Sequence, residues 1–102
     1  MTKSSSPNST MKKLHNLKNV GKATLSDLEL LGISSVEELV TQDPTFLFHE
    51  LERRTNHRQD PCVWDVFAAI IHEAATGEAT NWWAWTSKRK ALQKKGELDH
   101  VL

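Results

Sequence analysis

The chain has 102 residues, 38% of them hydrophobic, which suffices for one compact core and leaves little length for a second. It carries 13 basic and 13 acidic side chains, so no overall positive charge marks it as a nucleic-acid binder. A single cysteine excludes an internal disulfide, and no apolar run approaches the roughly 20 residues of a membrane-spanning helix.

Charge is nevertheless segregated along the sequence. Residues 1–23 contain five lysines and no acid, whereas residues 24–52 contain seven acids and no base. Two further basic groups follow, one at 53–58 and one at 88–95. A neutral chain can therefore still have a basic face.

The N-terminal residues 1–9 are polar and serine-rich, and we expect a disordered tail there without the hydrophobic core of a signal peptide. The domain is predicted over 10–96, with a frayed C-terminus over 97–102. A reducing, cytoplasmic setting without membrane contact is expected.

Leucines at helical spacing predict the first two helices. A short helix from about Thr10 presents Leu14 and Leu17 on one face and ends before Gly21. The next helix, over 22–31, ends at Gly32, where a left-handed C-terminal residue is favoured. Its apolar stripe consists of Leu25, Leu28 and Leu31.

Capping signals predict the following two helices. For the first, Ser34 with Glu37 or Ser35 with Glu38 would serve as a capping box. Asp-Pro at 43–44 then predicts a helix over 44–54. Its apolar side is predicted to consist of Phe46, Leu47, Phe48 and Leu51.

A second Asp-Pro pair, at 60–61, opens the most apolar helix of the chain, over 61–75, which Gly77 ends. Because apolar residues cover most of its circumference, we expect this helix to be the buried centre of the domain. Its narrow polar stripe consists of Asp65, His72 and Glu73.

The last predicted helix, over 87–95, is strongly basic and ends at Gly96. No window alternates with a period of two residues, so no sheet is predicted. The sequence therefore predicts an all-α fold, a compact bundle of about five short helices.

Residues 17–22 resemble the hairpin of a helix-hairpin-helix motif, in which a hydrophobic residue lies between two glycines and a leucine follows at helical spacing. Here Val20 is the hydrophobic residue, Gly21 the second glycine and Leu28 the leucine. Asn19 replaces the first glycine, and asparagine tolerates a left-handed conformation. Leu25 replaces a small residue.

Such a hairpin directs backbone N–H groups toward an anion at a helix N-terminus. We expect the amides of residues 20–22 to hold a DNA phosphate without reading bases, with lysine side chains and a threonine hydroxyl assisting. The alternative is a turn used only for packing. The predicted phosphate-binding residues are Lys18, Asn19, Val20, Gly21, Lys22 and Thr24.

Over about 14–90 the chain resembles the pathogenicity-locus family of helix-hairpin-helix proteins, also labelled mitomycin-resistance-like. The resemblance rests on Asn19-Val-Gly-Lys-Ala23, Leu31-Gly-Ile33, Gln42-Asp-Pro44, Gln59-Asp-Pro-Cys-Val63, Asp65-Val-Phe67, Trp82-Trp83, Thr86 and Arg89. It implies no established reaction, and the DNA binding that it implies comes from the motif.

Three tryptophans beside a basic group, at 82–90, could stack the bases of a single strand or could belong to the core. Of the three, Trp82 and Trp85 are expected to face Trp64 and Phe67, and Trp83 to be exposed. The secondary nucleic-acid contacts would be Trp83, Lys88, Arg89 and Lys90.

Cys62, with His57 and His72 in its neighbourhood, matches no nucleophile or metal-ligand pattern, because a thiol in the first turn of an apolar helix usually packs as a small hydrophobic group. No catalytic residue, metal or cofactor is predicted, and the chain is not expected to be an enzyme. The arginines at 53, 54 and 58 would complement a helix end or contact a second phosphate.

The function predicted is sequence-independent DNA binding, weak and salt-sensitive, with a link to DNA repair or damage tolerance that the family label suggests. The alternative is a protein-protein interaction module without DNA contact. A homodimer or a protein partner is also expected, because such hairpins often act in pairs and the sequence has no second glycine turn.

Overall fold

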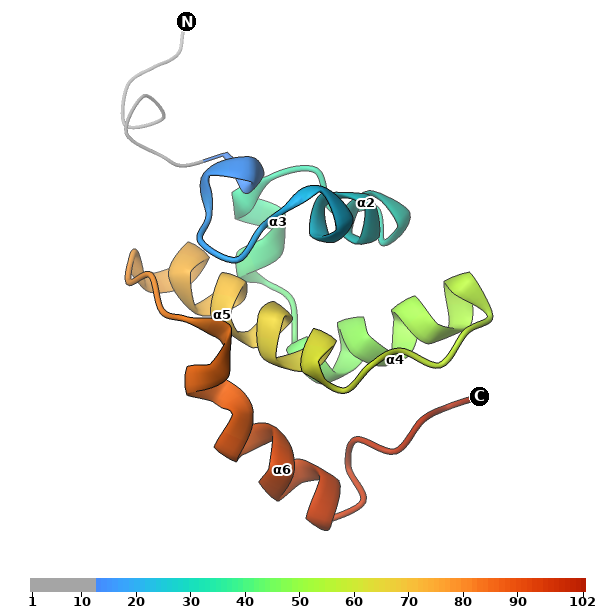
Figure 1. The fold of residues 1–102 in the computed structure, drawn as a ribbon. Helices are drawn as coiled ribbons and strands as arrows, with labels where there is room; N and C mark the ends of the chain where they lie inside the picture. Colours follow the sequence, from blue (N-terminus) through green and yellow to red (C-terminus); the bar gives the residue numbers. More distant parts are fainter. Residues whose placement is uncertain (1–12) are drawn as a thin grey trace, which may run out of the picture.

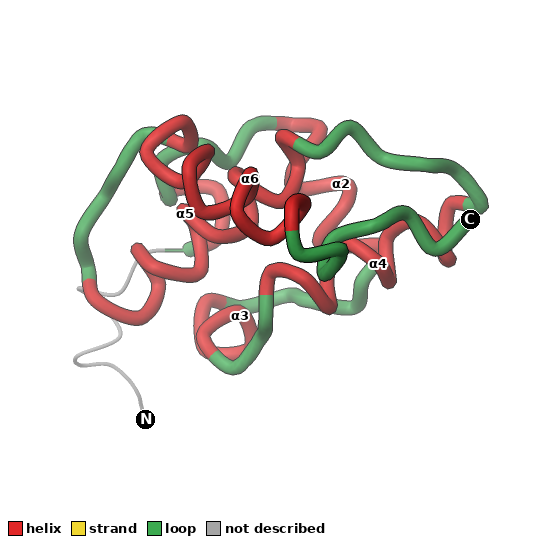
Figure 2. The backbone as a smooth tube through the Cα atoms, turned by 90° about the horizontal axis from the view of Figure 1, so that it is seen from below, coloured by secondary structure: helices red, strands yellow, loops and turns green. Residues whose placement is uncertain are grey.

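The computed structural model describes residues 13–102, which form five α-helices and two short 3-10 helices (Figure 1). In chain order these are η1 (Leu14–Asn16), α2 (Lys22–Leu30), α3 (Val36–Val40), α4 (Pro44–Thr55), α5 (Cys62–Thr76), η2 (Trp82–Trp85) and α6 (Thr86–Lys94). Figure 2 shows this part of the chain as helices and loops, without a strand. The predicted all-α fold class is confirmed. The tail predicted over 1–9 and the helix start near Thr10 lie outside the described residues.

The end of α2 is determined by Gly32, whose φ is +78°. Beyond the helix, the Ile33 N–H donates to the Leu28 carbonyl at 2.9 Å, and the Gly32 N–H donates to the Glu29 carbonyl at 3.0 Å. These bonds satisfy carbonyls that a helix end otherwise leaves free. The predicted stop at Gly32 is confirmed.

The start of α3 is capped by Ser35, whose Oγ accepts a hydrogen bond from the Glu38 N–H at 3.1 Å. In return, the Glu38 carboxylate accepts from the Ser34 N–H at 2.8 Å. Of the two predicted pairs, Ser35 with Glu38 is the one that caps α3, but the bond to the Glu38 carboxylate comes from the Ser34 N–H and not from the N-cap N–H of a true capping box. The Ser34 N–H and hydroxyl hold the pKa of Glu38 below its ordinary value.

The two Asp-Pro pairs begin α4 and α5 as predicted. Asp43 accepts a hydrogen bond from the Phe46 N–H at 2.9 Å, and Asp60 accepts one from the Cys62 N–H at 2.9 Å. Both carboxylates thus satisfy amides at a helix N-terminus. The Cys62 N–H lowers the pKa of Asp60.

α5 is the centre of the domain, as predicted. It contacts α3 and α4 as well as η2 and α6, with α2 and α3 on one side of it and α6 on the other (Figure 1). The larger core cluster contains Phe67 and Ile70 of α5 together with Leu14, Leu17, Leu28, Ile33, Val36, Leu39, Leu47 and Leu51. A smaller cluster contains Phe48, Trp64, Ala68 and Leu98. Among the helices of this described part, none is long and apolar enough to cross a membrane.

One sequence prediction about a helix face is wrong. Phe46 does not join the apolar side of α4 but is 54% exposed, because it lies on another side of the helix from the buried Leu47 and Leu51. Asp65 and Glu73, two residues of the predicted polar stripe of α5, are buried. Each of these two carboxylates accepts hydrogen bonds from another segment, which makes its burial tolerable.

Residues 97–102, predicted as a frayed end, contact α4 and the loop after it. Leu98 is buried in the smaller core cluster. The buried carboxylate of Glu52 accepts hydrogen bonds from the Val101 N–H at 2.9 Å and from His100 Nδ1. Arg58 Nε donates to the Leu102 carbonyl at 2.9 Å. His49 Nε2 also lies 2.8 Å from the Asp99 carbonyl, so the segment is held along its length by contacts that the sequence pattern did not indicate.

Candidate nucleic-acid interface

The turn at residues 17–22 joins η1 to α2. Its left-handed residue is Asn19, with a φ of +74°, and the Val20 N–H donates to the Leu17 carbonyl at 3.2 Å. Asparagine adopts this conformation more readily than most residues with a side chain. Asn19 therefore serves where the motif pattern has a glycine.

Two hydrogen bonds attach this turn to distant parts of the chain. The Lys18 N–H donates to Glu73 Oε1 at 2.9 Å, and Asn19 Nδ2 donates to the Thr80 carbonyl at 2.7 Å. The first partner lies near the end of α5 and the second in the segment that leads into η2. The turn is therefore fixed against both elements.

The N-terminus of α2 begins at this turn without a capping side chain. Within residues 13–102, no protein acceptor is bonded to the amides of Gly21, Lys22, Ala23 and Thr24. The Val20 N–H, predicted as a phosphate donor, is instead used inside the turn. Four successive N–H groups at the positive end of a helix are suited to receive an anion.

Gly21 leaves the approach to these amides open. Its φ is −108°, which any residue can adopt, so the backbone does not require glycine here. A Cβ atom added at this position would meet nothing within 4 Å. The missing side chain therefore serves access to the amides rather than the shape of the turn.

The charges around this helix start favour an anion. Lys18 and Lys22 are exposed, and the first turn of α2 contains no acidic residue. A cation at the first helical position is unfavourable on its own, because the helix dipole is positive there. A bound anion would be attracted both by the lysine side chain and by the helix dipole, and this attraction would offset the repulsion between them. Thr24, the last of the predicted residues, is half-buried.

The tryptophans at 82–85 differ in exposure. Trp83 is 60% exposed, as the sequence predicts. Trp85 is half-buried, packs against the smaller core cluster and donates from Nε1 to Thr80 Oγ1 at 2.9 Å. The Trp82 ring meets the Trp83 ring edge-on, with 5.6 Å between centroids. Trp85 thus belongs to the core, and Trp83 presents its ring to solvent.

The basic residues near these rings have different roles. Arg89 makes an ion pair with the fully buried Asp65, from Nε to Oδ1 at 3.0 Å, and its side chain is only 12% exposed. This internal pair removes Arg89 from the predicted set of surface contacts. Lys88 lies over the Trp85 ring, 5.4 Å from its centroid, and Lys90 is exposed.

Cys62 is half-buried, and burial together with the neighbouring Asp60 raises the pKa of its thiol. A raised pKa keeps the sulfur protonated near neutral pH, where a nucleophile or metal ligand needs the thiolate. Among the described residues, no three His, Cys, Asp or Glu side chains gather as a metal site.

The arginines at the end of α4 have protein partners. Glu50 bonds to Arg53 Nη1 at 3.3 Å and to Arg54 Nε at 3.1 Å, and Arg54 lowers the pKa of this carboxyl. Arg54 Nη1 also donates to the Leu30 carbonyl at the end of α2, 2.9 Å away. These contacts favour the helix-end interpretation over a second phosphate site.

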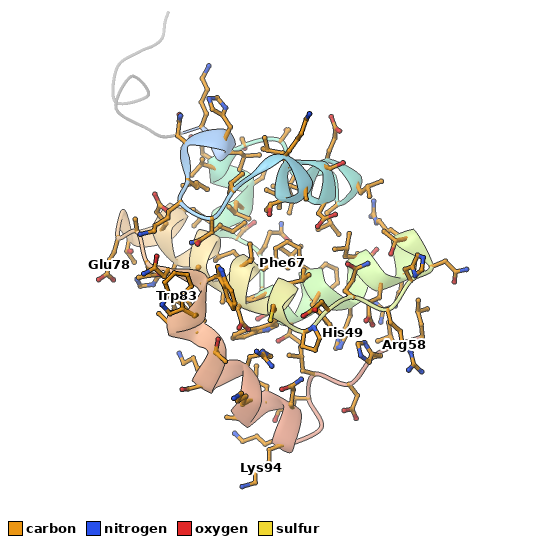
Figure 3. All side chains as sticks on the ribbon, in the orientation of Figure 1. His49, Arg58, Phe67, Glu78, Trp83 and Lys94 are labelled. Atoms are coloured by element: carbon orange, nitrogen blue, oxygen red, sulfur yellow. The ribbon has the colours of Figure 1, made fainter. Side chains whose placement is uncertain are left out.

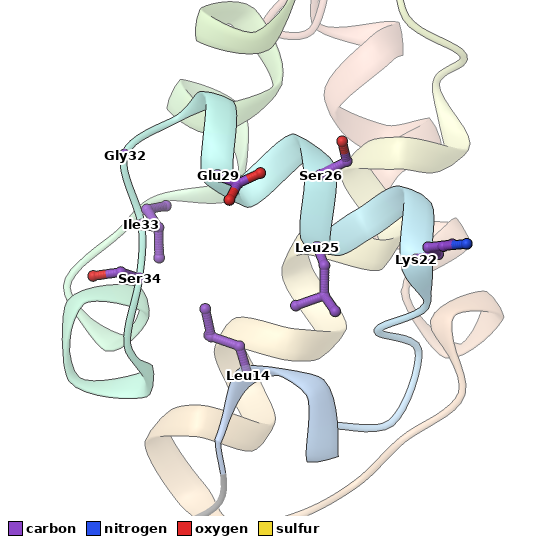
Figure 4. A pocket seen from close by; sticks show the side chains of 8 residues that line it. All are labelled: Leu14, Lys22, Leu25, Ser26, Glu29, Gly32, Ile33 and Ser34. Atoms are coloured by element: carbon purple, nitrogen blue, oxygen red, sulfur yellow. The ribbon is translucent and has the colours of Figure 1, made fainter.

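A pocket of about 570 Å³ adjoins the candidate interface. Figure 4 shows the side chains of Leu14, Leu25 and Ile33 pointing into it, with Lys22 at its edge. The rest of the lining comes from Ser26, Glu29, Gly32 and Ser34. An apolar floor with a polar rim is typical of sites that accept a small ligand or a protruding side chain.

Glu73 is the residue of this interface that sequence reasoning missed. The only sequence feature that points to Glu73 is its acidic side chain in a mostly apolar helix.

Replacing Glu73 with glutamine removes a charged acceptor of the Lys18 N–H, so we expect faster hydrogen exchange of that amide and a free energy of unfolding lower by about 1.5–3 kcal/mol. NMR exchange and urea unfolding check this. Glu78→Gln, which changes an exposed acid just beyond α5, is the control, and equal Lys18 exchange in both variants would contradict the anchoring role.

Comparison with known proteins connects this arrangement to one family. The profile of the family Cdd1, described as pathogenicity locus, matches residues 7–91. The mitomycin resistance protein McrB of Streptomyces lavendulae is 32% identical over 79 residues, which cover 78% of this chain and 75% of that protein. No solved structure matches the chain significantly. Since the family profile spans more than half of the sequence, the chain belongs to the pathogenicity-locus family.

Proposed function

We propose that this protein binds DNA without sequence preference by holding a backbone phosphate at the N-terminus of α2. The observation that carries the proposal is the group of four unbonded amides, Gly21 to Thr24, close to the exposed side chains of Lys18 and Lys22. In this view residues 17–30 act as a helix-hairpin-helix element. A link to DNA repair or damage tolerance is part of the proposal, motivated by the name of the Streptomyces relative.

The amides of Gly21 and Lys22 would donate to the phosphate oxygens, and the lysine side chains would add charge. These contacts fix the position of the backbone and leave base edges untouched. With about two or three phosphates neutralised, the logarithm of the affinity should fall against the logarithm of the salt concentration with a slope near −2 to −3. The binding is therefore expected to be weak at physiological salt.

The test is a triple variant, Gly21→Val with Lys18→Ala and Lys22→Ala. We expect it to lose at least tenfold in duplex DNA affinity at low salt and most of the salt slope, because each phosphate contact contributes about one unit of slope. Fluorescence anisotropy measures both quantities. The fold should survive, since Gly21 has open space around it.

The matched control removes two other exposed lysines, Lys94→Ala with Lys95→Ala, at the far end of α6. It changes the net charge equally and should leave the affinity within about twofold, because screening limits distant charges. If both variants bind DNA as tightly as the unaltered protein, the phosphate site is not at α2.

The pocket beside α2 favours a second function, docking of another protein. Its apolar floor of Leu14, Leu25 and Ile33 would accept an apolar side chain of a partner. Absence of any salt-sensitive DNA binding at low ionic strength would favour this function over the first. A homodimer could supply two α2 sites at once and raise DNA affinity through multivalency, which sedimentation at high protein concentration tests.

A further inference from the structure

We propose that Trp83 stacks an unpaired base of the same DNA strand whose phosphate is held at α2, which makes single-stranded DNA the preferred ligand. This inference rests on the proposed function, because the phosphate site supplies the anchor. It adds a second contact of different chemistry, an aromatic face for a base.

One hydrogen bond connects the 17–22 turn to the segment that leads to Trp83. Asn19 of the turn donates to the Thr80 carbonyl at 2.7 Å, and Thr80 lies three residues before Trp83. A chain spans at most about 3.6 Å per residue, so this short connection keeps the Cα atom of Trp83 within about 11 Å of the Cα atom of Thr80. An extended strand of several nucleotides is longer than this distance, so one strand could contact both places.

The Trp83 ring is both available and supported. It is 60% exposed, the highest exposed fraction among the large hydrophobic residues described. Trp82, half-buried, meets it edge-on at 5.6 Å, and η2 continues directly into α6. Figure 3 shows Trp83 near the start of α6, on the same side of the molecule as Glu78. An ordered, exposed indole costs little conformational entropy when a base stacks on it.

The surrounding charges suit a nucleic-acid strand. Lys88, five residues after Trp83, has its Nζ over the Trp85 ring. Lys18 and Lys22 belong to the turn that the Asn19–Thr80 hydrogen bond connects to the tryptophan segment. The exposed acid nearby, Glu78, is bonded to His72 Nε2 at 2.7 Å. A paired base in a duplex is already stacked on both faces, so an isolated ring of this kind selects an unpaired base.

The experiment compares two strands that differ only in their bases: a short single-stranded oligonucleotide and an abasic strand of the same length and phosphate number. The unaltered protein should bind the natural strand about tenfold more tightly, in line with the contribution of one stacked base. Trp83→Ala should abolish that preference without changing affinity for the abasic strand. Trp83→Phe should keep part of it. Phe46→Ala, which removes another exposed aromatic ring on α4, is the control and should behave as the unaltered protein.

The outcomes separate the two proposals. Equal binding of the natural and abasic strands by the unaltered protein overturns base stacking and leaves the phosphate site standing. A preference for the natural strand that survives Trp83→Ala also overturns it. Failure to bind either strand at low salt overturns the phosphate site and the stacking inference together. The triple variant at residues 18, 21 and 22 should lose affinity for both strands.

Discussion

Replacing Arg89 with methionine is expected to lower the free energy of unfolding by about 3–5 kcal/mol, because it leaves the carboxylate of Asp65 buried without its cation. Asp65 is fully buried in the first turn of α5, and Arg89 contacts both of its oxygens, at 3.0 Å and 3.3 Å. Thr86 Oγ1 donates to the same carboxylate at 2.8 Å and cannot supply a charge. Urea unfolding followed by circular dichroism measures the loss.

The matched control is Lys90→Met, the next basic residue of α6, which is exposed and should change stability by less than about 0.5 kcal/mol. The double variant Asp65→Leu with Arg89→Met should be more stable than Arg89→Met alone, because no unpaired charge then remains in the core. A single variant as stable as the control would show that the Asp65–Arg89 pair does not hold α6 against α5.

Replacing Glu52 with glutamine is expected to lower the free energy of unfolding by about 2–4 kcal/mol, the second largest effect. Its carboxylate accepts hydrogen bonds from the Gln59 N–H at 2.8 Å, from the Val101 N–H at 2.9 Å and from His100. A neutral amide makes weaker bonds to these donors and brings an N–H₂ group that has no place among them. Glu50→Gln, two residues earlier on α4, removes only ion pairs with the two exposed arginines Arg53 and Arg54 and should change the free energy of unfolding much less than Glu52→Gln.

The contribution of Glu52 to the free energy of unfolding should depend on pH. Burial opposes ionisation, but the Gln59 and Val101 amides and His100 outweigh it, and the pKa of Glu52 lies below its ordinary value. A carboxyl with a lowered pKa contributes stability above its unfolded pKa of about 4.3, and this contribution is lost as the pH falls through the folded pKa. The stability difference between the protein and Glu52→Gln should therefore be full at pH 7 and shrink below about pH 4. A difference that stays constant between pH 7 and pH 3 would contradict a charged Glu52.

The helix boundaries could be predicted because their causes are local. Asp43 caps α4, Asp60 accepts a hydrogen bond from the first amide of α5, and Gly32 and Gly77 end helices in the left-handed conformation. Each signal acts within a few residues of its own position, so the sequence alone contains it. The apolar circumference of α5 likewise predicted its central position.

The buried acids could not be predicted, because their burial depends on partners far along the chain. The helical period assigns Asp65 and Glu73 to a narrow polar stripe but does not show what they contact, and Arg89 and the Lys18 amide make their burial possible. Nothing local distinguishes the buried Glu52 from the partly exposed Glu50 on the same helix. Partners 24, 55 and 49 residues away decide the burial of Asp65, Glu73 and Glu52.

The candidate interface was predicted in part. Asn19 and Gly21 were identified from the motif pattern, and the structure assigns the left-handed conformation to Asn19 and the open approach to Gly21. The Val20 amide could not be judged from sequence, because its use depends on the local turn geometry. Arg89 looked like a surface cation in a basic run, and only the packing of α6 on α5 places it inside.

The bonds from the 17–22 turn to Glu73 and Thr80 also bear on how the protein folds. They span 55 and 61 residues, so the turn cannot reach its final geometry from local interactions alone. Contacts of such long sequence separation form late, after the entropy of closing the intervening loop has been overcome. Any activity of this turn should therefore appear only with the cooperative folding of the whole domain, and a peptide containing residues 13–41 alone should not reproduce it.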